Sequence, residues 1–190
     1  CMNVARVAGV CVALALLTPA QERAKAAPAS CESLASLRLS NATVTSAGEV
    51  APGAFTLPQP AGAAAVRAVA ALPAFCRVSA ASRPTADSDI RIEVWMPASG
   101  WNGRFQAVGN GGWAGTVPYA AMAAALARGY ATAGTDTGHT TPGASFVLGH
   151  PEKLVDFAHR SLHEMALHAK AAVSAYYGKA PAASLWNGCS

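Results

Sequence analysis

A serine that could serve as a nucleophile stands at the end of the sequence. The last residues, Gly188-Cys189-Ser190, follow a short apolar run and form the first half of the pattern Gly-x-Ser-x-Gly. In that pattern a sharp turn between a strand and a helix lifts the serine hydroxyl clear of the sheet, and small residues relieve the strain. An ordinary turn is the alternative for three residues alone. The strand and helix expected before them favour Ser190 as the nucleophile of an acyl transfer.

The glycine-rich segment 109–114 is the second candidate for chemistry. It matches the dinucleotide pattern G-x-G-x-x-A after an expected strand, and Asp136 lies where a ribose-binding acid is expected. It also fits an oxyanion loop, in which a backbone N–H points at the developing negative charge, or a plain tight turn. Trp113 is bulky for a turn that must press against a pyrophosphate, and an exported protein rarely meets free NAD. We therefore favour the oxyanion loop.

The histidines of the chain form no evident metal site. His163 and His168 are five residues apart, which puts them about 140° apart on a helix, whereas a zinc helix needs two histidines four apart. His159 and His163 share a face, but no third ligand is evident. The expectation is packed or solvated histidines and no metal. The five are His139, His150, His159, His163 and His168.

Chain order bears on which of these residues could complete a triad with Ser190. In hydrolases that carry a serine on such a turn, the acid and the histidine follow the serine. This order rules out Asp136 and the five histidines as triad partners. Asp136 and His139 are expected instead to order the loop beside the pocket.

Alternating strands and helices are expected to position these candidates. From residue 104 onward the order strand, helix, strand, helix, strand predicts an α/β fold with a parallel sheet and right-handed crossovers. Alternation of apolar and polar residues over 90–96 predicts a half-exposed strand. Segments 48–60 and 135–149 are expected to be loops, and the type of 61–71 is left open. The expected strands are 37–39, 42–44, 75–79, 90–96, 104–108, 130–134 and 183–187; the expected helices are 119–128 and 154–177, the latter with an apolar face from Leu154 to Val173.

Composition narrows the class of protein. The 190 residues suffice for one domain with a core, and 52% hydrophobic against 13% charged residues exclude a disordered chain. The net charge of +4 is mild, and no basic stripe is interleaved with aromatic residues, so nucleic-acid binding is not expected. No internal repeat is visible.

The first 29 residues are expected to be a signal peptide and a linker. A short basic region over 2–6 precedes an apolar run over 7–17, and Thr18-Pro19-Ala20 breaks that run. The run is too short to span a bilayer as a helix and has the length typical of a signal peptide. A buried N-terminal helix is the alternative. Cleavage after Ala20, Ala26 or Ala29 fits equally well, and the prediction is a secreted or periplasmic protein with no membrane segment after cleavage.

The cysteines agree with export. Removal of the signal peptide leaves Cys31, Cys76 and Cys189, and disulfides persist in an oxidising compartment. An odd number needs an explanation. Cys31 and Cys76 are a plausible pair that would tie the N-terminal segment to the domain. Cys189 is then expected to pair with a cysteine beyond Ser190.

Taken together, these motifs resemble the tannase and feruloyl esterase family of secreted α/β-hydrolases. Order and approximate spacing agree from about Cys31 to Ser190, and the set is more specific than any single motif, which decides against the dinucleotide interpretation. The segments that carry the resemblance are 92–97, 101–105, 109–115, 135–139, Asp156-Phe157, 160–163, Lys170, Tyr177-Gly178 and 188–190.

The resemblance implies a role for each candidate residue. Ser190 would be the nucleophile, and the backbone N–H of Gly112, or of its neighbour Gly111, would be one oxyanion donor, with residue 191 supplying the other. Cys189 would pair with a cysteine just before the triad histidine, and Cys31 with Cys76 would be the family's N-terminal disulfide.

The resemblance also implies what the chain lacks. Residues 30–190 would be the N-terminal part of an α/β-hydrolase domain, truncated at the nucleophile turn. The triad acid, the histidine and the lid domain, which carries a structural calcium in some members, would lie downstream. The chain itself would hold no cofactor and would be inactive alone. The substrate would be a small aromatic ester of the galloyl, feruloyl or terephthalate type. A dinucleotide-binding oxidoreductase and a non-catalytic secreted module are the rival hypotheses.

Overall fold

The computed structural model describes residues 28–58 and 62–188. Most of the predicted signal peptide lies outside these residues, and so do Cys189 and Ser190. The strands are β1 (Ala42–Val50), β2 (Phe75–Ser82), β3 (Ile90–Pro97), β4 (Arg104–Val108), β5 (Ala131–Thr135) and β6 (Ala183–Asn187). The helices are α1 (Ala63–Ala70), α2 (Tyr119–Leu126), α3 (Pro151–Val155) and α4 (Ser161–Tyr177), with 3₁₀ turns at Glu32–Ser36 and Ser145–Val147 and a π-helical turn at Asp156–Arg160.

The six strands form one mixed sheet in the order β1-β2-β3-β5-β4-β6. β4 pairs in parallel with both β5 and β6, as the alternation of strands and helices from residue 104 predicts. β1, β2 and β3 form an antiparallel meander, and β3 joins it to β5 in an antiparallel pairing. The parallel half therefore carries the α/β architecture, and the meander extends its sheet on one side.

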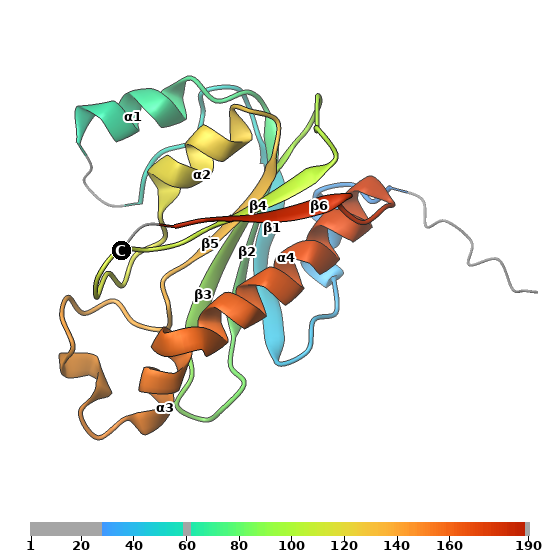
Figure 1. The fold of residues 1–190 in the computed structure, drawn as a ribbon. Coiled ribbons are helices and arrows are strands. Elements are labelled where there is room, and N and C mark those ends of the chain that lie inside the picture. The colour runs from blue at the N-terminus through green and yellow to red at the C-terminus, as the bar shows by residue number, and fades with distance from the viewer. Residues whose placement is uncertain (1–27, 59–61, 189–190) are drawn as a thin grey trace, which may run out of the picture.

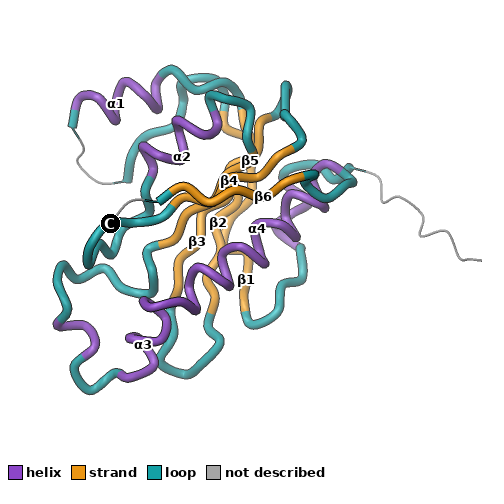
Figure 2. The backbone as a smooth tube through the Cα atoms, viewed as in Figure 1, coloured by secondary structure: helices purple, strands orange, loops and turns teal. Residues whose placement is uncertain are grey.

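Helices cover both faces of the sheet (Figures 1 and 2). α4 lies on one face, where Met165, Ala169 and Val173 join a core with apolar residues of the strands. α1 and α2 lie on the other face, where Met122 and Leu126 pack with a second core. The sheet is thus the middle layer of three, and the loops at its ends are free to form a site.

Some N-terminal predictions are wrong. β1 runs to Val50, so 48–50 belong to a strand and not to a loop, and residues 37–39 contribute only an isolated bridge at Leu39. The alanine-rich segment left open forms α1, which packs against α2. Long-range pairing of β1 with β2 extends the strand through Gly48, which alone would favour a turn.

The strand predicted at 90–96 forms as β3, but the prediction that one of its faces is exposed is wrong. In β3 only Arg91 is exposed, because the two cores cover both faces of the strand. Glu93 is buried as an ion pair with Arg77, whose Nη2 lies 2.6 Å from Glu93 Oε1. Trp95 fills the second core. Glu93, a polar residue within the alternation, is therefore a buried carboxylate paired with a half-buried arginine and does not mark a solvent face.

The long helical stretch predicted at 154–177 forms, but with an interruption. A π-helical turn at Asp156–Arg160 separates α3 from α4. Such a turn adds a residue to the helix and rotates the apolar face. Leu154, predicted on that face, is therefore 45% exposed, and Asp156 is buried.

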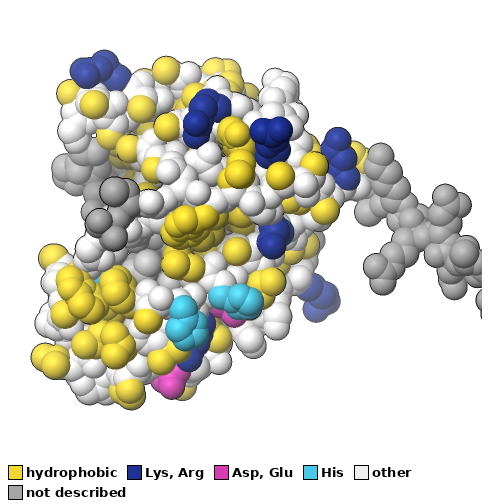
Figure 3. All heavy atoms as spheres, viewed as in Figure 1, with side chains coloured by type: hydrophobic (Ala, Val, Ile, Leu, Met, Phe, Trp, Pro, Cys, Tyr) yellow, Lys and Arg dark blue, Asp and Glu magenta, His cyan; other side chains and the backbone are white. Residues whose placement is uncertain are grey.

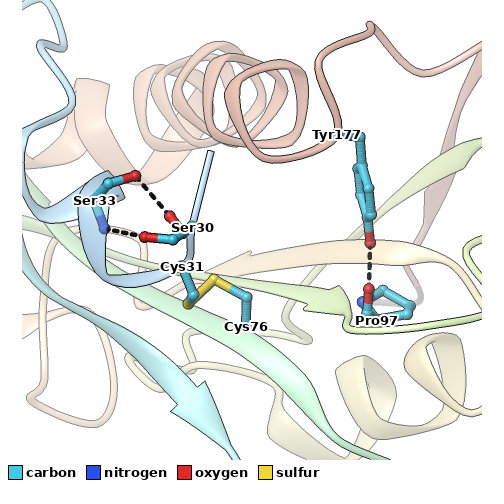
Figure 4. Close-up of a disulfide and its surroundings, with 6 residues drawn as sticks. All are labelled: Ser30, Cys31, Ser33, Cys76, Pro97 and Tyr177. Atoms are coloured by element: carbon cyan, nitrogen blue, oxygen red, sulfur yellow. Dashed lines mark hydrogen bonds between the residues drawn. A yellow bond between two sulfur atoms is a disulfide. The ribbon is translucent and has the colours of Figure 1, made fainter. Parts of the chain in front are cut away.

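A disulfide joins Cys31 to Cys76, as predicted, and the two Cα atoms are 5.5 Å apart (Figure 4). It fixes the turn at Glu32–Ser36 to β2 beneath α4. Near the C-terminus of that helix, the Tyr177 hydroxyl donates a hydrogen bond of 2.8 Å to the Pro97 carbonyl (Figure 4). These two links tie α4 and the N-terminal segment to the meander.

β6 forms one edge of the sheet, as expected for the strand before the serine, and both of its faces are exposed. Trp186 is 53% exposed. Apolar atoms lie uncovered in the middle of the face shown in Figure 3, along the course that β6 takes in Figure 1. Among the described residues, no helix has the length and apolar character needed to cross a bilayer.

Replacing both Cys31 and Cys76 by Ala in the full-length protein should lower its free energy of unfolding by about 2–4 kcal/mol, because the bond closes a long loop. Urea denaturation measures this. Each single Cys→Ala variant is the matched control and should lose nearly as much as the double variant, since either change breaks the same bond. If the decreases in unfolding free energy of the two single variants sum to the decrease of the double variant, the prediction that the disulfide stabilises the fold is wrong.

Candidate functional site

The candidate site lies at the edge of the sheet where β4, β5 and β6 end. Because these strands are parallel, the segments that follow them meet there. The N–H of Gly109, just after β4, donates a hydrogen bond of 3.0 Å to the Asn187 carbonyl at the end of β6. A Cβ at Gly109 would lie 2.5 Å from the Trp186 ring and 3.5 Å from the Cα of Gly188. Gly109 therefore lets the glycine loop run beside the residue that leads to Cys189 and Ser190.

Gly111 to Ala114 form a tight turn in this loop. The Ala114 N–H donates to the Gly111 carbonyl at 3.2 Å, and Gly112 has a φ of 53°, a conformation that favours glycine. The N–H of Gly112 and the carbonyl of Gly111 belong to one trans peptide and point in opposite directions. With that carbonyl turned into the turn, the Gly112 N–H points out of it. No described residue accepts a hydrogen bond from Gly111 or Gly112 N–H, so the turn can offer a donor to an anionic oxygen.

The Asn110 side chain fixes the base of this turn. Its Nδ2 donates to the Ala114 carbonyl at 3.1 Å and to the Thr135 carbonyl at the end of β5 at 3.0 Å. One amide therefore closes the turn and attaches it to the neighbouring strand. Sequence reasoning missed this role, although an asparagine between glycines of a loop is a typical signal for local hydrogen bonding.

Asp136 orders the next loop, as predicted. Its Oδ1 accepts hydrogen bonds of 2.9 Å from the backbone N–H groups of Arg91 and Gly138. The residue is only 5% exposed, and burial raises the pKa of Asp136 to about 6 despite these two donors. The carboxylate thus joins the start of β3 to the segment after β5.

His139 lies buried between the two loops and has the ordering role predicted for it. Its Nε2 is 3.2 Å from the Trp113 carbonyl of the glycine loop, and its Nδ1 is 3.2 Å from Thr137 Oγ1. A Cβ at Gly115 would lie 2.4 Å from the His139 carbonyl oxygen. Glycine at 115 therefore allows the two loops to touch.

Aromatic side chains pack around this contact. The His139 ring stacks on Phe146 with centroids 3.7 Å apart, and Trp113 stacks on Phe157 of the π-helical turn at 4.5 Å. Trp113 remains 43% exposed next to Gly112. Phe146 could not be predicted as part of the site, because it lies in a loop without apolar periodicity and meets His139 and Trp113 only in the folded chain.

Two hollows flank Asp136. One, of about 530 Å³, is mainly apolar, with Leu57, Val117 and Pro118 among its lining residues. Tyr119 lies at the wall of this hollow, and its pKa is raised to about 12. Burial is the main cause of the rise and the nearby Glu93 carboxylate is the second, so the Tyr119 hydroxyl stays protonated. The other hollow, of about 640 Å³, is polar and includes Asp89, His139, His150 and Lys153. Gly111 and Gly112 line neither hollow.

The other histidines lie apart from this edge or on its rim. His168 is buried in α4 with Glu164 Oε2 at 3.0 Å, and His150 pairs with Asp87 at 2.9 Å. His159 and His163 are exposed. In the described part of the chain, no three His, Cys, Asp or Glu side chains are grouped so that they could hold a metal ion.

The structure thus places Gly111, Gly112, Asp136 and His139 on the loops that follow β4 and β5, and Gly109 joins the first of these loops to the end of β6. Of the predicted site residues, Ser190 and Cys189 lie outside the described residues. The predicted Cys31–Cys76 pair lies beneath α4 and not at this edge.

Known proteins resemble this chain in sequence. The sequence model of the family described as tannase and feruloyl esterase matches residues 76–190. Over 178 residues the chain is 44% identical to an uncharacterized esterase of Xanthomonas campestris pv. campestris, covering 93% of this chain and 29% of that protein. It is 36% identical over 115 residues to a probable feruloyl esterase B of Aspergillus clavatus, covering 60% of this chain and 22% of that protein.

Solved structures resemble its fold. The crystal structure of feruloyl esterase B from Aspergillus oryzae superposes with a TM-score of 0.73 at 32% identity, over 84% of this chain and 31% of that one. A tannin acyl hydrolase from Aspergillus niger, at 19% identity and a TM-score of 0.56 over 81% of this chain and 30% of that one, shares the fold. The chain therefore spans less than a third of the length of these relatives.

Asp136→Asn should stabilise the full-length protein above pH 6. Burial raises the pKa of Asp136 from 3.8 to about 6, so the native state holds the proton more tightly than the unfolded state does. The aspartate's contribution to stability is therefore greatest below pH 4 and declines as the pH rises to about 6. Asparagine keeps the acceptor and does not ionise, so its advantage should grow over this range to about 1–3 kcal/mol.

Urea denaturation at several pH values measures the effect. The corresponding change Glu49→Gln, at an exposed carboxylate of β1, is the control and should show no such growth. Asp136→Ala should destabilise at every pH by about 1–3 kcal/mol, because it leaves two buried N–H groups without an acceptor. An Asp136→Asn protein that is less stable than wild type at pH 7 would show that the ionised carboxylate is favoured in the fold.

Proposed function

The chain belongs to the tannase and feruloyl esterase family, and on that premise we propose that the protein containing it hydrolyses aromatic carboxylic esters through an acyl-enzyme on Ser190. One structural observation carries the proposal. The loop that turns the Gly112 N–H outward is joined through Gly109 to Asn187, the last residue of β6, three residues before the serine. A nucleophile and an oxyanion donor must be neighbours for acyl transfer.

The mechanism has two steps. A histidine takes the proton of the Ser190 hydroxyl, whose oxygen attacks the ester carbonyl. The Gly112 N–H, with Gly111 as the neighbouring alternative, holds the negative oxygen, and the alcohol leaves with a proton from the histidine. Water then attacks the acyl-enzyme in the same way and releases the aromatic acid. A second oxyanion donor would be the N–H of residue 191.

Residues 1–190 supply only part of this machinery. Because the acid and the histidine follow the serine in chain order in this fold, residues 1–190 hold no candidate for either. We expect negligible turnover from them alone. The same proposal places a partner for Cys189 near the triad histidine, and the lid domain, with its structural calcium in some members, also beyond residue 190.

The names of relatives support the substrate class. Probable feruloyl esterases and a tannin acyl hydrolase are among them, which favours phenolic acyl groups of the feruloyl or galloyl type. The Cys31–Cys76 disulfide and the composition of residues 1–29 support export to an oxidising compartment. The match of segment 109–114 to a dinucleotide pattern is accounted for by the oxyanion turn.

A fluorophosphonate probe tests the nucleophile. The full-length protein should be labelled and should hydrolyse methyl ferulate, whereas Ser190→Ala should lose labelling and lower kcat by at least about 10³-fold, because no other group can form the acyl-enzyme. Ser184→Ala, an exposed serine of β6, is the matched control and should retain both. A wild-type protein that is not labelled, or a Ser190→Ala variant that is, would refute the proposal.

A further inference from the structure

A continuous hydrogen-bonded chain leads from His139 to the Gly112 N–H. The His139 Nε2 lies 3.2 Å from the Trp113 carbonyl, and the N–H of the same peptide, on Ala114, donates to the Gly111 carbonyl at 3.2 Å. The Gly111 carbonyl belongs to the same peptide group as the Gly112 N–H. Two peptide groups therefore connect the imidazole to the outward-facing donor.

The tautomer of His139 follows from its partners. A carbonyl oxygen can only accept, so the Nε2 atom that faces Trp113 carries the hydrogen. The opposite ring nitrogen faces the Thr137 hydroxyl. Thr137 has a φ of 61°, which is unusual for a β-branched residue. The Oδ1 of Asp136 holds this strained loop by accepting from the next N–H, that of Gly138, so the imidazole is aimed by a fixed backbone.

We propose that His139 is a positioning residue for the oxyanion hole: by donating to the Trp113 carbonyl, it holds the Gly111–Ala114 turn with the Gly112 N–H directed at the reacting ester. The inference rests on the proposed function. It also assigns the donor, since Gly112 N–H and not Gly111 N–H terminates the chain. Aligned peptide dipoles polarise one another, so the same chain makes Gly112 N–H a stronger donor.

The size of the effect follows from the cost of a misplaced donor. Loss of one oxyanion donor lowers kcat by about 10²–10³-fold. Loss of the His139 hydrogen bond, with Asn110 still closing the turn, should lower kcat by less, about 10- to 100-fold. The loss should fall on kcat and leave KM within about twofold, because the interaction forms with the transition state and not with the ground state.

Two substitutions separate the hydrogen bond from packing. His139→Phe keeps a ring against Phe146 and removes the donor. His139→Gln removes the ring and keeps an N–H that reaches about as far as Nε2. His163→Phe, at an exposed histidine of α4, is the matched control.

We expect His139→Phe in the full-length protein to lose about 10- to 100-fold in kcat for methyl ferulate, and His139→Gln to recover to within about tenfold of wild type. A His139→Phe enzyme with wild-type kcat would overturn the proposal. A folded His139→Gln enzyme as slow as His139→Phe would overturn it too, because packing would then be what matters. If neither variant folds, His139 serves the stability of the fold and not the positioning of the turn, and this result would also overturn the proposal.

Hydrogen–deuterium exchange of segment 109–115 distinguishes this proposal from the esterase function. The amide of Ala114 should exchange faster in His139→Phe and regain protection in His139→Gln. That pattern in a full-length protein without esterase activity would refute the proposed function and leave the anchoring of the turn standing. Unchanged exchange in His139→Phe, with esterase activity present in the wild type, would refute the anchoring alone.

Discussion

The parallel pairing of β5, β4 and β6 is the constraint on which the site depends. Three segments far apart in the chain, after residues 108, 135 and 187, reach one edge of the sheet because these strands run in the same direction. The register then brings single atoms into contact, such as the Gly109 N–H and the Asn187 carbonyl. Without that pairing the glycine loop and the end of β6 would share no surface, and no local propensity would bring them together.

Much of this arrangement could be predicted from the sequence where the signal was periodic or local. The strands and helices from residue 104 to 187, the disulfide and the ordering role of Asp136 follow from apolar patterning, cysteine count and position after a strand. The exposure of β3 could not be predicted, because Glu93 is polar and its partner, Arg77, comes from another strand. Nor could the π-helical turn, which depends on the burial of Asp156 against Ser88 and Arg160.

The wrong exposure of β3 and the missed π-helical turn have the same physical cause, which is a buried charge. Periodicity treats a charged residue as a mark of solvent, but a charge can enter the interior when a partner or backbone donors replace water. Glu93 has the guanidinium of Arg77, Asp156 has that of Arg160, and Asp136 has two N–H groups. Only Asp136 lacks a cation in direct contact, and it is the carboxyl whose pKa burial raises to about 6. Such a group is expected beside a site and not within a core.

The two sides of the site differ in how firmly the described residues hold them. The glycine turn is bound to the β5 side by Asn110 and His139, with aromatic packing behind it, so these contacts hold its conformation without a ligand. Preorganisation of this kind is what makes a backbone N–H effective toward a developing oxyanion. Among the described residues, β6 is held by its pairing with β4 and by the Gly109 N–H, and both of its faces are open. The Gly111–Ala114 turn is therefore held from the β5 side, and in the esterase that we propose, these interactions, distant from the serine in sequence, would set how accurately the oxyanion donor meets Ser190.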